Sequence, residues 1–391
     1  MKTVFYYIVF CLLVACSGKS NKNENVQDGL IVLDWDKDYP LKEISLQEIA
    51  DVEYIPMETR PDVLLDGTSF HLILMSDSLI VTDNRNGDVF VFNRQGKNIH
   101  VFNRTGRDGE QYTKIAFMAV DFMKQEIFIT AYPRNQTIKV YAFDGTFKRA
   151  LKLPQNYELS QFFNYDEESL IAIDEYDIHN KKELLTNPRP YVLISKKDGR
   201  VTSVDLTLEE RVTGRMYIPE LRGTISWPVS ALLKSGRECF ISDLGSDTIY
   251  RLENRKLIPF MVKRPSCAWK LNPPKVACVR LKTGRYIFVD FFEQKAFQEG
   301  VPENYRKLVY DQQTGEIFTY RLINQDYQPG KAEKLGQFFC DLPTGYAREK
   351  LAPTQLLQDY EAGKLQGKLK EVASRLNEED NTVLMLVKFK E

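Results

Sequence analysis

The pattern of apolar and polar positions repeats between residues 78 and 151. Each of two copies contains a short apolar strand, a polar turn, a second apolar strand, a tight glycine turn and a third strand. The copies cover residues 79–83, 88–92 and 98–102, and then residues 126–130, 137–141 and 147–151. Gly96 and Gly145 occupy the tight turns, where positive φ costs glycine nothing. A unit of roughly four strands recurring every 40–50 residues predicts a β-propeller blade.

The same pattern of strands and turns recurs along the rest of the chain. Its second strands are expected at residues 79–83, 127–131, 170–174, 239–243, 287–291 and 383–387. Continuous apolar runs of this kind are typical of strands buried on both faces. We therefore predict an all-β, six-bladed β-propeller of four-stranded antiparallel blades over residues 30–391, with seven blades as the alternative. An N-terminal strand near residues 52–57 is expected to complete the last blade and remove an exposed edge.

One region departs from strand periodicity. Between residues 352 and 377 apolar residues fall at helical spacing, among them Leu356, Tyr360, Leu369 and Leu376. The glycines within it allow two short helices. We expect this helical insertion to interrupt a sixth blade that begins near residues 337–341, before its last strand at residues 382–389.

The N-terminus predicts export. Residues 1–15 have a basic start and an apolar core too short to span a bilayer, as signal peptides do. They end in Leu13-Val14-Ala15-Cys16, which resembles the lipobox of bacterial lipoproteins, in which the cysteine is acylated. Residues 16–29 then read as a lipidated flexible tether. The expectation is a cell-envelope protein, an outer-membrane lipoprotein on the periplasmic or surface-exposed face; the alternative is an ordinary secretory signal with an incidental cysteine.

At this point the sequence resembles a known family, the six-bladed β-propeller lipoproteins of Gram-negative gut anaerobes, related to NHL-repeat and TolB-like propellers. The resemblance rests on residues 52–59, 106–112, 143–145 and 369–390. The family's first crossing usually ends in a Gly-Pro-Gly-Glu-Tyr-like motif, and here residues 108–112 read Asp-Gly-Glu-Gln-Tyr. The resemblance implies fold and envelope location, but no activity.

Composition and charge narrow the range of possible functions. The formal net charge is −1, so the chain has no basic excess for nucleic acid. It contains three histidines, none at metal-ligand spacing, and no HExxH, GxSxG or phosphate-loop motif. We therefore expect a non-enzymatic module that binds a ligand or protein. The alternatives are a metal-dependent propeller lyase or hydrolase with its site on the ring axis, and a structural subunit of an envelope assembly.

Candidate site residues fall into two groups. Asp83, Asp174 and Asp243 end second strands in register, so a ring of carboxylates could bind calcium; strand-end turn capping is the alternative. The second group lies on blade crossings and long connections, where propellers carry sites. Its members suit a carbohydrate, peptide or protein surface, and they are Arg104, Arg107, Arg222, Trp227 and Trp269.

Four cysteines remain after the signal and Cys16, and none has CxxC spacing. Cys267 and Cys278 flank a proline-containing loop and could form a disulfide in an oxidising envelope. Buried free thiols are the alternative for all four.

Overall fold

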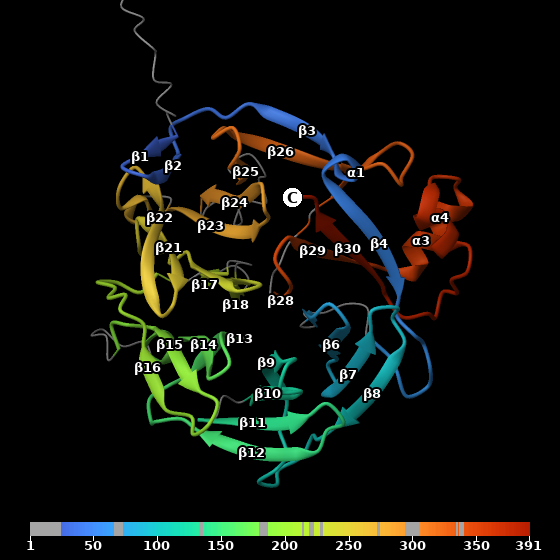
Figure 1. Cartoon of the computed structure of the whole chain (residues 1–391), viewed down its shortest axis with the longest axis horizontal. Coiled ribbons are helices and arrows are strands. Elements are labelled where there is room, and N and C mark those ends of the chain that lie inside the picture. The colour runs from blue at the N-terminus through green and yellow to red at the C-terminus, as the bar shows by residue number, and fades with distance from the viewer. Residues whose placement is uncertain are drawn as a thin grey trace, which may run out of the picture.

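The chain forms a ring of six blades around a central axis, as Figure 1 shows. The computed structural model describes residues 25–65, 73–132, 136–179, 187–212, 215–218, 223–226, 230–271, 274–293, 305–333, 335 and 340–391. Its sheets are the six blades and one separate two-stranded hairpin. The predicted all-β, six-bladed propeller is therefore confirmed.

Blades one to three follow in chain order, each with its first strand at the axis and its fourth at the rim. Blade one contains β5 (Ile73–Met75), β6 (Leu79–Asp83), β7 (Asp88–Asn93) and β8 (Asn98–Asn103). Blade two contains β9 (Ile115–Asp121), β10 (Glu126–Ala131), β11 (Thr137–Ala142) and β12 (Phe147–Lys152). Blade three contains β13 (Leu159–Asn164), β14 (Ser169–Asp174), β15 (Tyr191–Ser195) and β16 (Val201–Ser203), with the short helix α2 (Tyr176–His179) after β14.

Blades four and five continue the ring. Between blades three and four lies the separate hairpin of β17 (Arg215–Ile218) and β18 (Gly223–Ser226). Blade four contains β19 (Leu232–Ser235), β20 (Glu238–Ile241), β21 (Thr248–Glu253) and β22 (Lys256–Arg264), followed by the 3₁₀ helix η2 (Ala268–Lys270). Blade five contains β23 (Lys275–Lys282), β24 (Tyr286–Glu293), β25 (Tyr305–Asp311) and β26 (Ile317–Asn324), extended by β27 (Lys331–Glu333).

Blade six combines both ends of the chain. Its sheet consists of β29 (Tyr346–Leu351), β30 (Val383–Phe389) and the N-terminal β4 (Ala50–Pro56), which pairs antiparallel with β30. The short strand β28 (Cys340–Asp341) precedes β29 in the chain. The predicted closure by an N-terminal strand is confirmed. The two predicted helices are α3 (Pro353–Glu361) and α4 (Gly367–Ala373), at the outer rim.

Within blade six one assignment was wrong. The blade was expected to begin near residues 337–341, but its first strand is β29, which pairs with β30 along its length. Residues 383–387 form the second strand, as expected. Strand β28 also departs from the regular pattern: it pairs in parallel with β5 of blade one.

The N-terminal segment runs around the outside of three blades. Strand β1 (Val26–Gln27) folds back on β2 (Leu30–Asp34), and β2 adds in parallel to β22 of blade four. Strand β3 (Leu41–Ser45) adds in parallel to β26 of blade five, and the short helix α1 (Leu46–Ile49) leads into β4. These strands cover rim edges that would otherwise expose unpaired backbone groups. We call residues 30–56 the N-terminal belt.

The glycine turns fit between successive blades. Gly96 has φ of +80°, and a Cβ there would collide with the carbonyl oxygen of Pro56, where the rim strand of the preceding blade ends. Gly145 has φ of +83° and lies in the same way against Phe102. Each turn therefore needs glycine both for its conformation and for close packing between blades.

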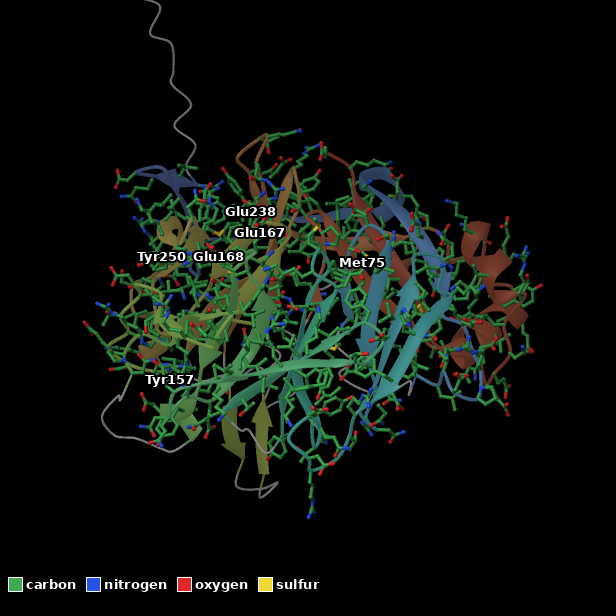
Figure 2. All side chains as sticks on the ribbon, turned by 60° about the horizontal axis from the view of Figure 1, so that its bottom comes forward. Met75, Tyr157, Glu167, Glu168, Glu238 and Tyr250 are labelled. Carbon is green, nitrogen blue, oxygen red and sulfur yellow. The ribbon has the colours of Figure 1, made fainter. Side chains whose placement is uncertain are left out.

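The two faces of the ring differ. Figure 2 shows Met75, Glu167, Glu168 and Glu238 on one side, which carries the tight turns between first and second strands, and we call it the turn face. The β17–β18 hairpin, drawn in olive, extends from the opposite side, which we call the hairpin face. No helix in the part of the chain that the structure describes is long and apolar enough to cross a membrane.

Candidate functional site

A polar network joins blades three and four beneath the hairpin face. Its members are Asp174, Tyr191, Arg211, Asp243 and Lys263, and we call them the hairpin-face network. Two of them, Asp174 and Asp243, are among the aspartates singled out in the sequence. The others come from the middle of blade three, the connection before the hairpin, and the rim strand of blade four.

Asp174 ends β14 and holds the surrounding turns. Its Oδ1 accepts hydrogen bonds from the backbone N–H groups of Glu158 and Tyr176, both at 3.0 Å, and its Oδ2 accepts one from Asn187 Nδ2 at 3.1 Å. Burial raises the pKa of Asp174, and these hydrogen bonds act against the rise. The carboxylate therefore caps a strand end, the role named as the alternative to calcium binding. The Arg211 guanidinium donates to its backbone carbonyl at 3.0 Å.

Asp243 connects the two blades. Its Oδ2 accepts a hydrogen bond from the hydroxyl of Tyr191, a fully buried residue on β15, at 2.6 Å. Its Oδ1 accepts the backbone N–H of Gly245 at 2.8 Å. Because Tyr191 belongs to blade three and Asp243 to blade four, this short bond fixes one blade to the next. Burial and the neighbouring carboxylate raise the pKa of Tyr191 well above its usual value, so the hydroxyl keeps its proton.

Lys263 is the unusual member of the network. It lies on β22 with only 2 % of its surface exposed, and its Nζ donates to the backbone carbonyl of Asp243 at 2.9 Å. Burial lowers the pKa of Lys263 to about 8, although the charges of Asp243 and Asp247 oppose the shift. Because the amine is sealed from solvent, it acts here by positioning the Asp243 turn.

The connections above the network also meet. Glu210, on the connection that leads to the hairpin, forms a salt bridge with Lys270 of η2 at 3.3 Å. Trp269, a sequence candidate, is half-buried in η2, and its Nε1 is buried without a hydrogen-bond partner. The backbone of Glu210 also lies against Gly245. The two long connections are therefore held together over blades three and four.

The other sequence candidates do not join this network. Arg104 is exposed, and its Nε donates to the Gly145 carbonyl at 2.8 Å, which makes it part of the packing between blades. Arg107 is exposed on the same crossing. Asp83 is buried at the end of β6 in blade one. Arg222 and Trp227 lie outside the described residues, as does Cys16.

The expected calcium site has no matching set of ligands. Across the described residues, no three His, Cys, Asp or Glu side chains lie close enough together to hold a metal ion. Asp174 and Asp243 already accept hydrogen bonds at both carboxylate oxygens. In this structure Asp174 and Asp243 make the strand-end hydrogen bonds of the alternative interpretation.

The ring axis is not an open channel at the turn face. Cys340 and Asp341 pair with β5 of blade one, and Leu342 forms a parallel bridge with Ser235 of blade four. Thr344 Oγ1 then donates to the Ser235 carbonyl at 3.2 Å. Since blades one and four lie on opposite sides of a six-bladed ring, this segment runs between them and occupies the space that an axial site would use.

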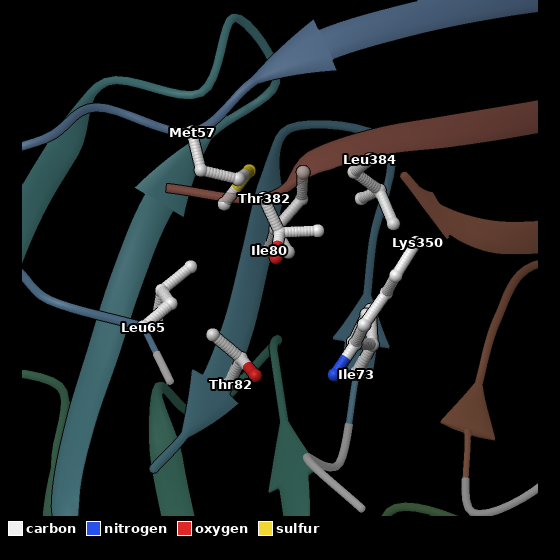
Figure 3. Close-up of a pocket in the computed structure, with 8 residues that line it drawn as sticks. All are labelled: Met57, Leu65, Ile73, Ile80, Thr82, Lys350, Thr382 and Leu384. Carbon is white, nitrogen blue, oxygen red and sulfur yellow. The ribbon is translucent and has the colours of Figure 1, made fainter. Parts of the chain in front are cut away.

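A hollow between blades six and one is too small for a ligand. Figure 3 shows its eight lining residues, which are Met57, Leu65, Ile73, Ile80, Thr82, Lys350, Thr382 and Leu384. Its volume is about 20 Å³, room for little more than one water molecule. The walls are mostly apolar. This hollow is a packing defect near the axis and offers no binding site.

The cysteines remain separate. Cys267 is an exposed free thiol and Cys278 is a buried one, so the disulfide considered from the sequence is not formed. Cys239 is likewise buried and free. Burial raises the pKa of Cys278 to about 12, which keeps that thiol protonated.

Sequence reasoning missed Tyr191, Arg211 and Lys263. Tyr191 begins an apolar strand, and nothing in that run marks a hydroxyl that reaches the next blade. Lys263 had one usable signal: it is a cation near the end of a long strand, residues 256–264, that otherwise continues the blade pattern. Their partners lie 52 and 20 residues away. Packing between blades brings Tyr191 to Asp243, and strand pairing within blade four brings Lys263 to the same turn.

Fold and site together define a six-bladed propeller with a polar network between two blades. The chain belongs to the family described as "Domain of unknown function (DUF4934)", whose model matches residues 30–388. A comparison with curated proteins found no match.

Among solved structures, one similar protein comes from Bacteroides fragilis NCTC 9343 and is described as exported. It has a TM-score of 0.67 and 16 % identity, over 92 % of this chain and 100 % of that chain. A protein of unknown function from Bacteroides thetaiotaomicron VPI-5482 has a TM-score of 0.41 and 12 % identity, over 87 % of this chain and 76 % of that chain. At these identities the first similarity shows the fold alone.

Proposed function

We propose that this chain is a lipid-anchored propeller of the cell envelope that binds a protein partner through its hairpin face. The observation that carries the proposal is the β17–β18 hairpin. Within the described residues its two strands pair only with each other, and they extend away from the ring. A two-stranded hairpin alone is marginally stable in water, so a projecting one gains stability from a partner.

The chemistry of the hairpin favours a polypeptide over the carbohydrate that the sequence also allowed. Each strand keeps one edge that no described strand pairs with. Such an edge offers backbone N–H and C=O groups in register, which an extended polypeptide can match by strand addition. Glu210, on the connection before the hairpin, forms a salt bridge with Lys270, which links this connection to η2.

The proposed lipid anchor is based on the N-terminal sequence. The lipobox-like Leu13–Cys16 stretch supports acylation at Cys16, and eight residues lie between that cysteine and Asn25. A tether of that length spans at most about 30 Å. It leads to β1, next to β2 at the rim of blade four.

Site-specific photo-crosslinking in producing cells tests the hairpin. A photoreactive residue replaces Tyr217 on β17, and a matched one replaces Glu238 on the turn face. We expect a discrete protein adduct at position 217 and none at position 238. No adduct at 217, or the same adducts at both positions, would overturn the proposal. A glycan adduct at 217 would replace the protein partner by a carbohydrate.

Membrane fractionation tests the anchor separately. The Cys16→Ala variant should move from the membrane to the soluble fraction, because it lacks the thiol that is acylated. Cys267→Ala, which removes an exposed thiol of the propeller, is the control and should stay with the membrane. Membrane retention of the Cys16 variant would contradict the lipoprotein assignment and leave the hairpin proposal intact.

A further inference from the structure

A second feature lies on the turn face, across the ring from the hairpin. Blades two, three and four enclose a groove there of about 680 Å³. Its lining includes six cationic and three acidic side chains, together with the hydroxyl groups of Ser169, Ser195 and Thr202. Figure 2 places Glu168, one of the lining residues, on this face. A groove of this size matches a small ligand.

Three of the cations are bound within the walls. Lys196 is buried and forms a salt bridge with Asp121 at 2.6 Å. Arg149 binds Glu126 in a bidentate pair, at 2.7 and 2.8 Å, and also donates to the Lys196 carbonyl. The pair with Arg149 is the main reason that the pKa of Glu126 falls to about 2. Arg255 contacts Glu168 at 3.3 Å. These contacts neutralise the wall charges and fix the shape of the groove.

The remaining cations are available to a ligand. Lys124, Lys197 and Arg200 line the groove, and Lys197 and Arg200 form no salt bridge with any described residue. The ammonium of Lys124 donates to the backbone carbonyl of Glu167, at 2.6 Å, and forms no salt bridge with a described residue. One carboxylate, Asp198, stands between Lys197 and Arg200 and already accepts the Arg200 backbone N–H. The groove thus keeps an excess of positive charge after its internal pairs are satisfied.

We propose that this groove binds a small ligand carrying two or more phosphate groups, either free or as the headgroup of a lipid. Arginine matches phosphate oxygens with two parallel N–H groups, and lysine supplies a point charge. Hydroxyl groups on the walls add neutral hydrogen bonds to the same oxygens. The site is separate from the hairpin face and does not depend on the proposed protein partner.

Calorimetric titration of the lipid-free propeller with inorganic pyrophosphate at low salt tests the site. The test variant carries Lys197→Glu and Arg200→Glu, both on exposed side chains. The control carries Lys368→Glu and Lys370→Glu on α4, which changes the net charge equally on another part of the surface. We expect the test variant to bind pyrophosphate roughly tenfold more weakly, equivalent to about 1.4 kcal/mol, and the control to match the wild type.

Vesicle flotation separates the two sources of phosphate. Cardiolipin carries two phosphates in its headgroup. Wild type that floats with vesicles containing cardiolipin but not with phosphatidylcholine vesicles, and loses this in the test variant, identifies a lipid headgroup. Pyrophosphate binding without flotation identifies a free ligand. The proposal is overturned if the wild type binds neither probe. Equal binding by the test and control variants would also overturn it, because the attraction would then reflect net charge alone.

Discussion

Two buried lysines, one under each face, are held in opposite ways. Lys196, below the turn-face groove, has 3 % of its surface exposed and meets the Asp121 carboxylate at 2.6 Å. Lys263, below the hairpin face, is 2 % exposed, and its Nζ donates to the backbone carbonyl of Asp243. Burial disfavours the charged form of each amine. Lys196 differs from Lys263 in having a carboxylate oxygen, that of Asp121, at hydrogen-bond distance.

The difference shows how the two regions use charge. Below the groove, buried charge is compensated within the walls, so the exposed cations above it act on ligands. Below the hairpin, the Lys263 charge is stabilised only by a dipole and by more distant carboxylates, so it tolerates deprotonation. We therefore expect the groove walls to respond strongly to loss of a partner, and the hairpin-face network to respond to pH.

The largest effect is expected at the groove. Asp121→Asn keeps the shape of the side chain but leaves Lys196 buried without its counter-charge. We expect the free energy of unfolding, measured with urea, to fall by about 3–5 kcal/mol. Asp144→Asn is the control, since Asp144 is an exposed turn aspartate that accepts the Thr146 N–H and faces no buried lysine. Similar losses in both variants would show that the charge pair at Lys196 has no special weight.

The next effect is a dependence on pH at Lys263. Its folded pKa of about 8 lies below the ordinary 10.5, so between these values the unfolded chain holds a proton that the folded chain has released. Stability contributed through this group therefore rises as pH increases across that window, by roughly 3 kcal/mol in total. Below pH 8 the full penalty of the buried charge remains.

Lys263→Met removes this titration. The difference in unfolding free energy between wild type and Lys263→Met, measured at about pH 7.5 and about pH 10.5, should move by roughly 3 kcal/mol in favour of the wild type at the higher pH. Other groups that titrate in this range are common to both proteins and cancel in the difference. A difference that does not change with pH would show that Lys263 keeps its proton throughout.

A smaller loss is expected for Tyr191→Phe. The substitution leaves Asp243 Oδ2 without the hydroxyl that bonds it at 2.6 Å and should lower the unfolding free energy by about 1.5–3 kcal/mol. Tyr250→Phe on the adjoining β21 is the control, because no described residue bonds its hydroxyl. If both variants lose the same stability, the link between blades three and four contributes nothing through this hydrogen bond.

The smallest effect is expected at the groove rim. Arg255 is half exposed, and its ion pairs with Asp166 and Glu168 are both 3.3 Å long. Arg255→Gln should therefore change the unfolding free energy by no more than about 1 kcal/mol, and added salt should reduce the difference further. Urea unfolding at low and high salt measures it, and a larger loss that salt does not reduce would place Arg255 among the structural charges.

Much of the fold could be predicted because it is encoded locally. The glycine turns at Gly96 and Gly145, the apolar second strands and the helical spacing near Leu356 each depend on neighbours in sequence. The missed strand is instructive. In β29 only Ala347 and Leu351 are buried, so its composition resembles a polar connection, and the blade was expected to begin near residues 337–341 instead.

The candidate site was less predictable. The positions of Asp174 and Asp243 at strand ends followed from the repeat, but their hydrogen-bond partners belong to other strands, one of them in another blade. The turn-face groove was even harder to predict from the sequence. Lys196 and Lys197 are adjacent in the same turn, yet one is buried against Asp121 and the other is exposed. The packing of blade two on blade three buries Lys196 and leaves Lys197 exposed.

The N-terminal belt has a consequence for the time course of folding. Ile31 pairs with Met261, and Val52 pairs with Val387, so the first strands to leave a ribosome or translocon find their partners among the last. Contacts of such long sequence separation slow folding, because the chain must close long loops before they form. Strand β2 of the belt can pair once β22 is complete, but β4 has no partner until residue 389 has emerged. We therefore expect ring closure to be the late, rate-limiting event in the maturation of this protein.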